Sequence, residues 1–312
     1  MLTVPKASGS NTPLRVERAR LDFLRASRFY ACFKKYQMVA PTVTILFALT
    51  IYPMVYMVWI SLHEWPIIAT LPRRFEGLEQ YEYLLFDRSF WDAVCASATY
   101  LTISVTLQVG LGFAFALLLS VGGAGTTIVR LLFMLPLFIS PVVAALIWKF
   151  MLGYDLGILN YFIRSIGLPP VNWLGGEGMA MASLILVDVW QWTPFSILIL
   201  LAGLASLPSE PYEAAVLDGA SPWQTFLYIT LPMMLPALAV VVLFRTVDAF
   251  KMFDLAYVLT RGGPGDATNV LALEVWRRGF FENQMGAAAA ISVFMVVIAL
   301  GLVSILAKLV KI

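Results

Sequence analysis

Long apolar runs alternate with polar segments along this chain, and six of the runs are long enough to cross a membrane. A membrane-spanning helix needs about 20 mostly apolar residues. The expected spans are Tyr36–Ile60, Ala93–Leu119, Leu131–Leu152, Met179–Leu204, Pro236–Val258 and Gly286–Leu309. The pattern therefore predicts an all-α, polytopic membrane protein with about six transmembrane helices.

The composition supports lipid as the surrounding solvent. Hydrophobic residues make up 60% of the 312 residues and charged residues 13%, and the mean hydropathy is +0.84. A soluble domain carries roughly a quarter charged residues. The formal net charge of +2 gives no reason to expect a nucleic-acid partner.

Basic residues before the first span predict the orientation, because Lys and Arg are enriched on the cytoplasmic side. Residues 1–35 hold eight of them against Glu17 and Asp22. With six spans, both termini are expected in the cytoplasm, although Arg261, Arg277 and Arg278 then fall outside. We divide the chain into this basic segment, which is either a solvated tail or a short helix on anionic lipid, and a transmembrane domain, 36–312.

Two loops carry specific local signals. Glycines and prolines after the third span surround a short apolar piece, Ile158–Ile166, which predicts a small interfacial helix. The loop between the fourth and fifth spans, 206–236, predicts two short helices. Ser209 and Ser221 are expected to cap them, and Gly219 is expected to supply the left-handed residue that ends the first.

The bend of the second loop is rich in small residues, which let another backbone approach closely. Pro232 and Pro236 are expected to bound the return into the membrane. Such a compact cytoplasmic segment suits docking into a groove on a partner. The same features also fit an ordinary helical hairpin.

The spacing in this loop matches a family pattern. Glu213-Ala214-Ala215 is followed after three residues by Gly219 and after nine more by Ile229-Thr230-Leu231-Pro232. This resembles the EAA loop of binding-protein-dependent ABC importer permeases. The stretches Tyr154–Gly175 and Val258–Thr268 resemble loops of the carbohydrate, MalF/UgpA-type branch. The resemblance covers the chain strongly from Leu131 onward and its first third by topology only.

The resemblance implies a type I ABC importer permease fold in the bacterial cytoplasmic (inner) membrane. It implies a second permease subunit, expected to differ from this chain, two ATP-binding cassette subunits, an external solute-binding protein and a carbohydrate substrate moved by alternating access. It also implies that the loop docks on the ATPase. The coupling residues it implies are Glu213, Ala214, Ala215, Asp218, Gly219, Ala220, Ile229, Leu231 and Pro232.

The chain has no Walker A sequence, because no glycine cluster is followed by the required Lys. No Ser-His-Asp or metal-ligand constellation appears either, so we expect no catalytic residue, bound metal or cofactor in this chain. ATP and Mg are expected on the partner ATPase subunits. The chain is thus expected to be a permease subunit and not an enzyme.

Polar residues at membrane depth are costly unless they pair or face a cavity, which makes those on the fourth and fifth spans candidates for the substrate pathway. The candidates are Asp188, Trp190, Gln191, Trp192, Thr193, Arg245, Asp248, Lys251, Phe253 and Asp254. Arg245 with Asp248, and Lys251 with Asp254, are spaced i,i+3 and can instead neutralise each other. An unpaired Arg245 or Lys251 would favour an anionic solute.

Two other functions remain open at this stage. A secondary transporter or channel would need no coupling loop and no ATPase. A membrane enzyme would need a carboxylate site in a sizeable loop, for which only the acidic segment His63–Asp92 is available, and it holds no recognised pattern.

Overall fold

The computed structural model describes residues 39–68, 72–120 and 126–310. The chain divides into two units, Met1–Tyr56 and Met57–Ile312. Helix α2 (Ala40–Ser61) begins in the first unit and ends in the second. The expected basic segment 1–35 lies outside the described residues.

Five described helices are long and apolar enough to cross a membrane, which confirms a helical polytopic protein. They are α2, α4 (Arg88–Ser120), α8 (Glu177–Ala205), the continuous stretch Pro222–Phe250, and α14 (Met285–Val310). Helix α4 begins five residues before the expected start at Ala93, because the mixed segment Arg88–Asp92, with two charged residues, continues the helix beyond the apolar run.

The third expected span, Leu131–Leu152, is not one continuous helix. It consists of α5 (Thr126–Met134), a 3-10 turn η1 (Leu135–Phe138) and α6 (Pro141–Met151), with a bend of 97° between its two halves. Pro141 lacks a backbone N–H and forces the residue before it out of the helical region. Ser140 is accordingly extended, with ψ 139°.

The fifth expected span, Pro236–Val258, is wrong at both ends. Helix α11 (Leu231–Phe250) already contains Pro236 in its interior and stops eight residues before Val258. A turn over Lys251–Phe253 leads into α12 (Asp254–Leu259). The apolar run continues through this break, so hydropathy alone does not reveal it.

Shorter elements complete the second unit. A two-stranded antiparallel sheet pairs β1 (His63–Glu64) with β2 (Arg74–Phe75). Helices α3 (Glu79–Phe86) and α13 (Leu271–Trp276) and a π-turn η3 (Arg277–Phe281) lie outside the long spans. Helix α7 (Ile158–Ser165) confirms the short helix expected after the third span.

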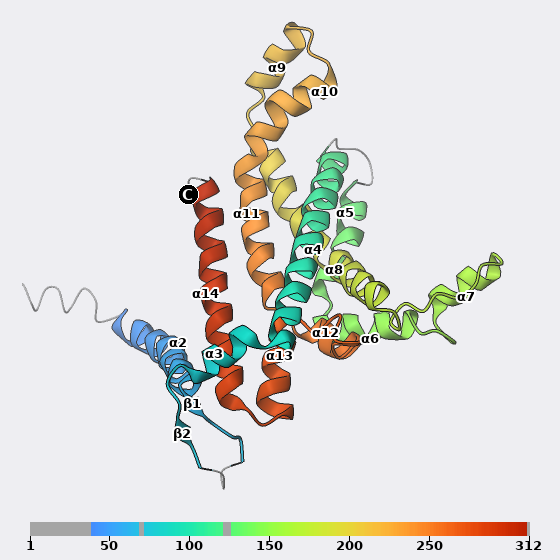
Figure 1. Ribbon diagram of the computed structural model, residues 1–312. Coiled ribbons are helices and arrows are strands. Elements are labelled where there is room, and N and C mark those ends of the chain that lie inside the picture. Colours follow the sequence, from blue (N-terminus) through green and yellow to red (C-terminus); the bar gives the residue numbers. More distant parts are fainter. Residues whose placement is uncertain (1–38, 69–71, 121–125, 311–312) are drawn as a thin grey trace, which may run out of the picture. The chain divides into compact units, whose positions relative to one another are not determined.

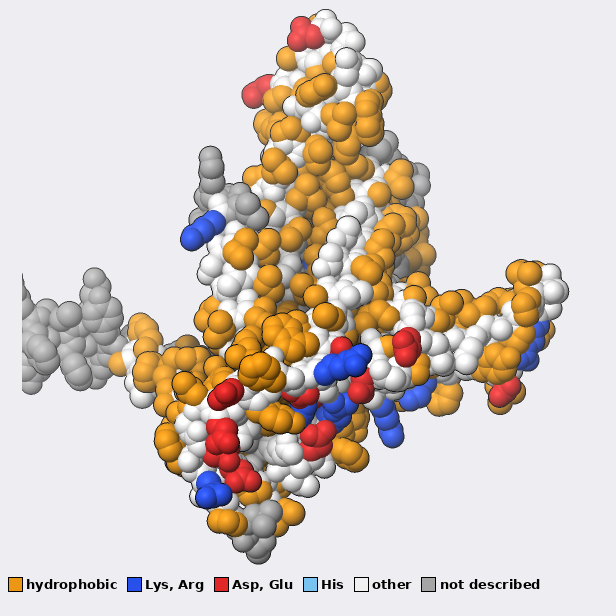
Figure 2. Space-filling model, in the orientation of Figure 1, with side chains coloured by type: hydrophobic (Ala, Val, Ile, Leu, Met, Phe, Trp, Pro, Cys, Tyr) orange, Lys and Arg blue, Asp and Glu red, His pale blue; other side chains and the backbone are white. Residues whose placement is uncertain are grey.

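Within the second unit, α4, α8, α11 and α14 run alongside one another (Figure 1). The short helices that follow α8 form one end, and α3, α12 and α13 form the other. Helices α4 and α8 share the largest helix contact, because Gly112 has no side chain: an added Cβ would lie 2.5 Å from that of Ser196. Charged side chains gather around α3, α12 and α13, while apolar ones cover the long helices (Figure 2).

Candidate functional site

The loop after α8 folds into two short helices, as the sequence predicts. The first, α9 (Glu210–Leu217), ends in a Schellman turn in which Gly219 has φ +71°. The N–H of Gly219 donates to the carbonyl of Val216 at 3.2 Å, and that of Ala220 donates to Ala215 at 2.9 Å. Gly219 therefore adopts the left-handed conformation that the sequence predicts. Glycine is favoured here because it has no Cβ, which in other residues makes a positive φ sterically unfavourable.

The two expected serine caps behave differently. Ser221 accepts a hydrogen bond from the N–H of Gln224 at 3.3 Å, and the Gln224 side chain accepts one from the Ser221 N–H at 2.8 Å. This capping box begins α10 (Pro222–Thr225). Ser209 precedes α9 but makes no side-chain cap hydrogen bond, because its own backbone is already helical, with φ −77° and ψ −26°.

Helix α10 continues directly into the membrane. A π-turn, η2 (Phe226–Thr230), joins it to α11, and the Leu231 N–H donates to the Phe226 carbonyl. The expectation that Pro232 and Pro236 bound the return is therefore wrong. Pro232 lies in the first turn of α11, where its missing N–H is tolerated, and the helix passes through Pro236.

The segment Ser206–Thr230, which we call the knob, has an apolar outer surface, and its short helices are held together by a hydrogen bond. Val216, Leu217 and Trp223 are 77%, 88% and 67% exposed. The Tyr212 hydroxyl donates to the Thr230 hydroxyl at 3.2 Å and ties α9 to η2. Exposed apolar side chains on a fixed frame suit a partner interface.

The knob divides the coupling candidates into two groups. Glu213, Ala214, Asp218 and Gly219 are exposed, Ala220 is partly buried, and Ala215 is buried beneath them. Ile229, Leu231 and Pro232 lie in or beside η2, and Leu231 packs against the core between α4, α8 and α11. The first group can meet a partner, and the second joins the knob to α11.

A buried charged cluster forms where α4, α8 and α11 meet. Gln108 donates from Nε2 to Oδ2 of Asp188 at 2.6 Å, and its Oε1 accepts from Nε of Arg245 at 2.6 Å. Arg245 Nη2 lies 3.5 Å from Asp188 Oδ2, and Nη1 lies 2.6 Å from Asp248 Oδ2. The Arg245 guanidinium also stands 4.6 Å from the centre of the Trp192 ring.

The pairing of Lys251 differs from the expected one. Its Nζ lies 3.4 Å from Oδ1 of Asp248, not in an ion pair with Asp254, because the helix ends at Phe250 and the i,i+3 geometry is lost beyond it. Arg245 and Asp248 do pair as the spacing allows. Both cations thus face carboxylates.

A small hollow of about 140 Å³ opens beside this cluster. Seven of the ten pathway candidates line it, and Arg245 belongs to the network beside it. Those lining it are Asp188, Gln191, Trp192, Asp248, Lys251, Phe253 and Asp254. Pro141 also lines it, so both helix breaks reach the hollow. Irregular backbone at membrane depth is tolerated where it is covered by protein or lines a cavity.

Trp190 and Thr193 lie elsewhere, on another face of α8. Both line a larger, mostly apolar hollow of about 370 Å³ between α4, η1 and α8. The Thr193 hydroxyl donates to the Val189 carbonyl at 2.6 Å, and Trp190 packs edge-on against Trp148. The pathway candidates are therefore not one group.

Gln108 is the member of the cluster that the sequence analysis missed. It is fully buried and is the contact that joins α4 to both charged residues. Its polar amide in an apolar span was a visible signal, since such groups need partners in lipid, but the partners lie 80 and 137 residues away.

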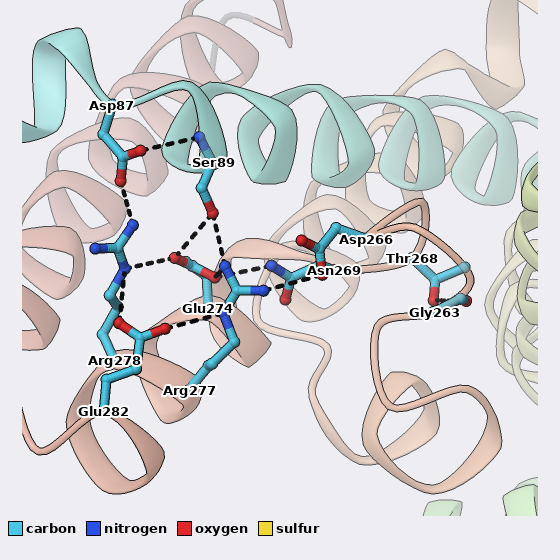
Figure 3. Close-up of polar contacts among 10 residues, drawn as sticks. All are labelled: Asp87, Ser89, Gly263, Asp266, Thr268, Asn269, Glu274, Arg277, Arg278 and Glu282. Atoms are coloured by element: carbon cyan, nitrogen blue, oxygen red, sulfur yellow. Dashed lines mark hydrogen bonds and ion pairs between the residues drawn. The ribbon is translucent and has the colours of Figure 1, made fainter.

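A second ion-pair network (Figure 3) lies around α13, at the end of the unit opposite the knob (Figure 1). Glu274 is fully buried and accepts from Nε of Arg278 at 2.7 Å, and its Oε2 lies 2.8 Å from Nη2 of Arg277. Arg278 also pairs with Asp87, directly before α4. The network fixes α13 and η3 to the start of α4.

The same network explains two positive charges that weighed against the expected orientation. Burial opposes the charge of both arginines, yet Glu274, together with Asp266 and Glu282, raises the pKa of Arg277. Hydrogen bonding and attraction by Glu274, with Asp87 and Glu282, raise the pKa of Arg278. Each arginine is charged but matched by carboxylates, so neither adds free positive charge at this end.

Residues 108–311 match the model of the binding-protein-dependent transport system inner membrane component. The chain belongs to this family. The match covers the knob, α11 and the buried cluster, and it identifies a multi-pass transport permease of the inner membrane, not an enzyme. Among the described residues, no group of three or more His, Cys, Asp or Glu side chains could hold a metal ion.

Relatives of this permease include named sugar transport subunits. The trehalose/maltose transport system permease protein MalF of Thermococcus litoralis is 37% identical over 86% of this chain and 91% of its own length. The trehalose transport system permease protein SugA of Mycobacterium tuberculosis is 34% identical over 83% and 82%. The chain is therefore a permease of the sugar ABC importer family.

The fold also matches a solved importer. A bacterial ABC transporter involved in the import of the acidic polysaccharide alginate superposes with a TM-score of 0.78, covering 91% of this chain and 98% of that chain. At 24% identity this likeness supports the fold alone.

Proposed function

We propose that this permease carries a neutral sugar or oligosaccharide into the cytoplasm by alternating access, driven by a separate ATPase that docks on the knob. The observation that carries the coupling part is the knob itself. It combines exposed apolar residues with a glycine whose added Cβ would meet nothing within 4 Å. A partner surface can therefore approach the backbone at this turn.

The knob can transmit movement because it is mechanically continuous with a membrane helix. Trp223 stacks on Phe226 at 5.5 Å between ring centres, and Phe226 lies 5.9 Å from Phe113 on α4. Through η2 it also continues into α11, which carries Arg245 and Asp248. A displacement of the knob would therefore reach the charged cluster.

The charge balance of the hollow supports a neutral substrate. Two cations, Arg245 and Lys251, are matched by Asp188 and Asp248, and Asp254 adds a further carboxylate. An acidic sugar would meet no free cation here. Hydrogen-bonding groups beside Trp192 and Phe253 suit a polyhydroxylated ligand that stacks on aromatic rings.

The size of the hollow supports a second permease subunit. A small-molecule site usually encloses about 300–1,000 Å³, more than the 140 Å³ found here. We infer that another permease supplies the opposite wall, and that an external solute-binding protein delivers the sugar. In this arrangement the knob faces the cytoplasm and α3 and α13 face outward.

The test is purification of the tagged native chain from its own membrane, followed by mass spectrometry of the proteins that accompany it. An ATP-binding cassette subunit and a second permease are expected. Reconstituted complex should hydrolyse ATP faster with binding protein and trehalose or maltose than with a uronate oligosaccharide. A chain that purifies alone and transports without ATP would instead be a secondary transporter.

A further inference from the structure

A stripe of polar residues follows the buried face of α4. Tyr100, Ser104 and Gln108 are spaced four residues apart, which places them on one face of the helix. Their exposed fractions are 1%, 0% and 0%. Gln108 is explained by its bonds to Asp188 and Arg245. An apolar residue at Ser104 would pack at membrane depth without any desolvation cost, so this position needs another explanation.

One member of the stripe has no partner. The Ser104 hydroxyl is buried and makes no hydrogen bond, and Nη2 of Arg245 is likewise unbonded. The Tyr100 hydroxyl interacts with the Asp188 carboxylate and, electrostatically, with Arg245 and Asp248, so these groups belong to one region. An unsatisfied buried polar group costs about 1–3 kcal/mol, and such groups are uncommon in native structures.

The covering elements contain the two helix breaks. Tyr100 packs in a core with residues of α8, α11 and α12. Helix α11 ends at Phe250, and Gln191 of α8 donates to the carbonyl of Ile139 in the other break at 2.8 Å. Element ends of this kind absorb hinge movements, so the stripe lies beneath the part of the unit best able to shift.

We propose that Tyr100, Ser104 and Gln108 form a concealed wall of the sugar pathway, covered by α8, α11 and α12 in this structure and exposed during transport. The unpartnered Ser104 hydroxyl then bonds to a sugar hydroxyl or to water in the open state. The inference rests on the proposed function, because it assumes movement driven through the knob and α11.

Ser97 provides a matched control on the same helix. It too is buried, but its hydroxyl accepts the Leu271 N–H at 2.7 Å. Its role is therefore structural, fixing α13 to α4. Ser97→Ala should lower the unfolding temperature of the complex, whereas Ser104→Ala should leave it unchanged or raise it.

The decisive experiment measures accessibility in the complete complex. Ser104→Cys and Ser97→Cys are made in a background without Cys32 and Cys95, and each is treated with a small hydrophilic methanethiosulfonate reagent. Labelling of Ser104→Cys should rise about tenfold or more when ATP and binding protein are added, as a minor open state becomes populated. Ser97→Cys should not respond.

Either of two results would overturn the proposal. One is unchanged labelling of Ser104→Cys in a complex whose ATPase still responds to binding protein. The other is a fall in unfolding temperature for Ser104→Ala as large as that for Ser97→Ala, which would reveal a structural partner. Failure of the ATPase response itself would count against the proposed function, and the alanine comparison would still decide the inference.

Discussion

Gln108 of α4 donates from Nε2 to Oδ2 of Asp188 of α8 at 2.6 Å, in a fully buried bond that joins two membrane helices. The same amide accepts from Arg245 of α11. A single side chain therefore bonds to one carboxylate and to Nε of one guanidinium. Arg245 and Asp188 themselves form an ion pair, with Nη2 and Oδ2 3.5 Å apart, but Nη2 makes no hydrogen bond.

Replacing this amide should destabilise the permease. Gln108→Leu removes both hydrogen bonds while keeping a similar volume, and it leaves Asp188 and Arg245 short of partners. The expected loss is about 1–3 kcal/mol for each unsatisfied group, read as a lower unfolding temperature of purified protein in detergent. Thr106→Val, at a neighbouring exposed position, is the control. Equal stability of both variants would mean that the ion pair needs no bridge.

The close contact of α4 and α8 gives a second prediction with a control two residues away. A Cβ at Gly112 would lie 2.5 Å from that of Ser196, whereas one at Gly110 would meet nothing within 4 Å. Gly110→Ala should therefore stabilise the helix by up to about 1 kcal/mol. Gly112→Ala should lower the unfolding temperature by forcing the helices apart. If the two substitutions act alike, the packing distance does not depend on the missing side chain.

Coupling through the knob is tested by Gly219→Glu. A charged side chain at this exposed turn should block approach of the ATPase, so recovery of that subunit and binding-protein-stimulated ATP hydrolysis should fall severely. Gly167→Glu is a matched control, because Gly167 has φ +82° and equally open surroundings but follows α7 in the outer loop. Both substitutions place an L-residue at a positive φ, which costs the same backbone strain of about 1–2 kcal/mol.

The control also separates strain from docking. Loss of coupling in Gly219→Glu alone identifies the knob as the contact with the ATPase. Equal loss in Gly167→Glu would attribute the effect to destabilisation of the chain.

The network around Glu274 should be a stabilising element at the outer end. Glu274→Gln removes the negative charge that pairs with the partly exposed Arg277 and the buried Arg278. Breaking a buried ion pair costs about 3–5 kcal/mol. Hydrogen exchange in residues 261–282 should become faster, because this segment is held to α4 through Asp87 and Ser89.

An exposed ion pair supplies the comparison for Glu274. Arg88 and Asp92 lie 3.8 Å apart with side chains 94% and 60% exposed, and exposed pairs contribute little. Asp92→Asn should therefore leave exchange unchanged. Unchanged exchange in Glu274→Gln as well would show that apolar packing of Leu271 holds the segment.

The sequence alone predicted the features that depend on neighbours in the chain. Apolar runs predicted five of the spans, with the bounds of the fifth misplaced. The left-handed turn at Gly219 and the cap at Ser221 followed from local residue preferences. The break before Pro141 was signalled by its proline, but the long apolar run around it obscured the bend. The end of α11 at Phe250 had no comparable signal.

Contacts between distant segments were the part that sequence reasoning could not supply. The partners of Gln108 lie 80 and 137 residues away on other helices. Glu274 pairs with Arg277 and Arg278 in its own segment, but the link from Arg278 to Asp87 spans 191 residues. The pairing of Lys251 was misassigned for a related reason: the i,i+3 rule holds only within a helix, and the helix ends just before it.

The π-turn Phe226–Thr230 has a consequence for rotation about the helix axis. Its i→i+5 bond from Leu231 to Phe226 accommodates one residue more than a continuous α-helix would. Each α-helical residue turns the chain by about 100°, so the surplus residue sets the azimuth of α10 against that of α11. Deleting one residue here would leave α10 and α11 unchanged in sequence. It would rotate the knob about the helix axis, so that its exposed apolar residues no longer face the partner.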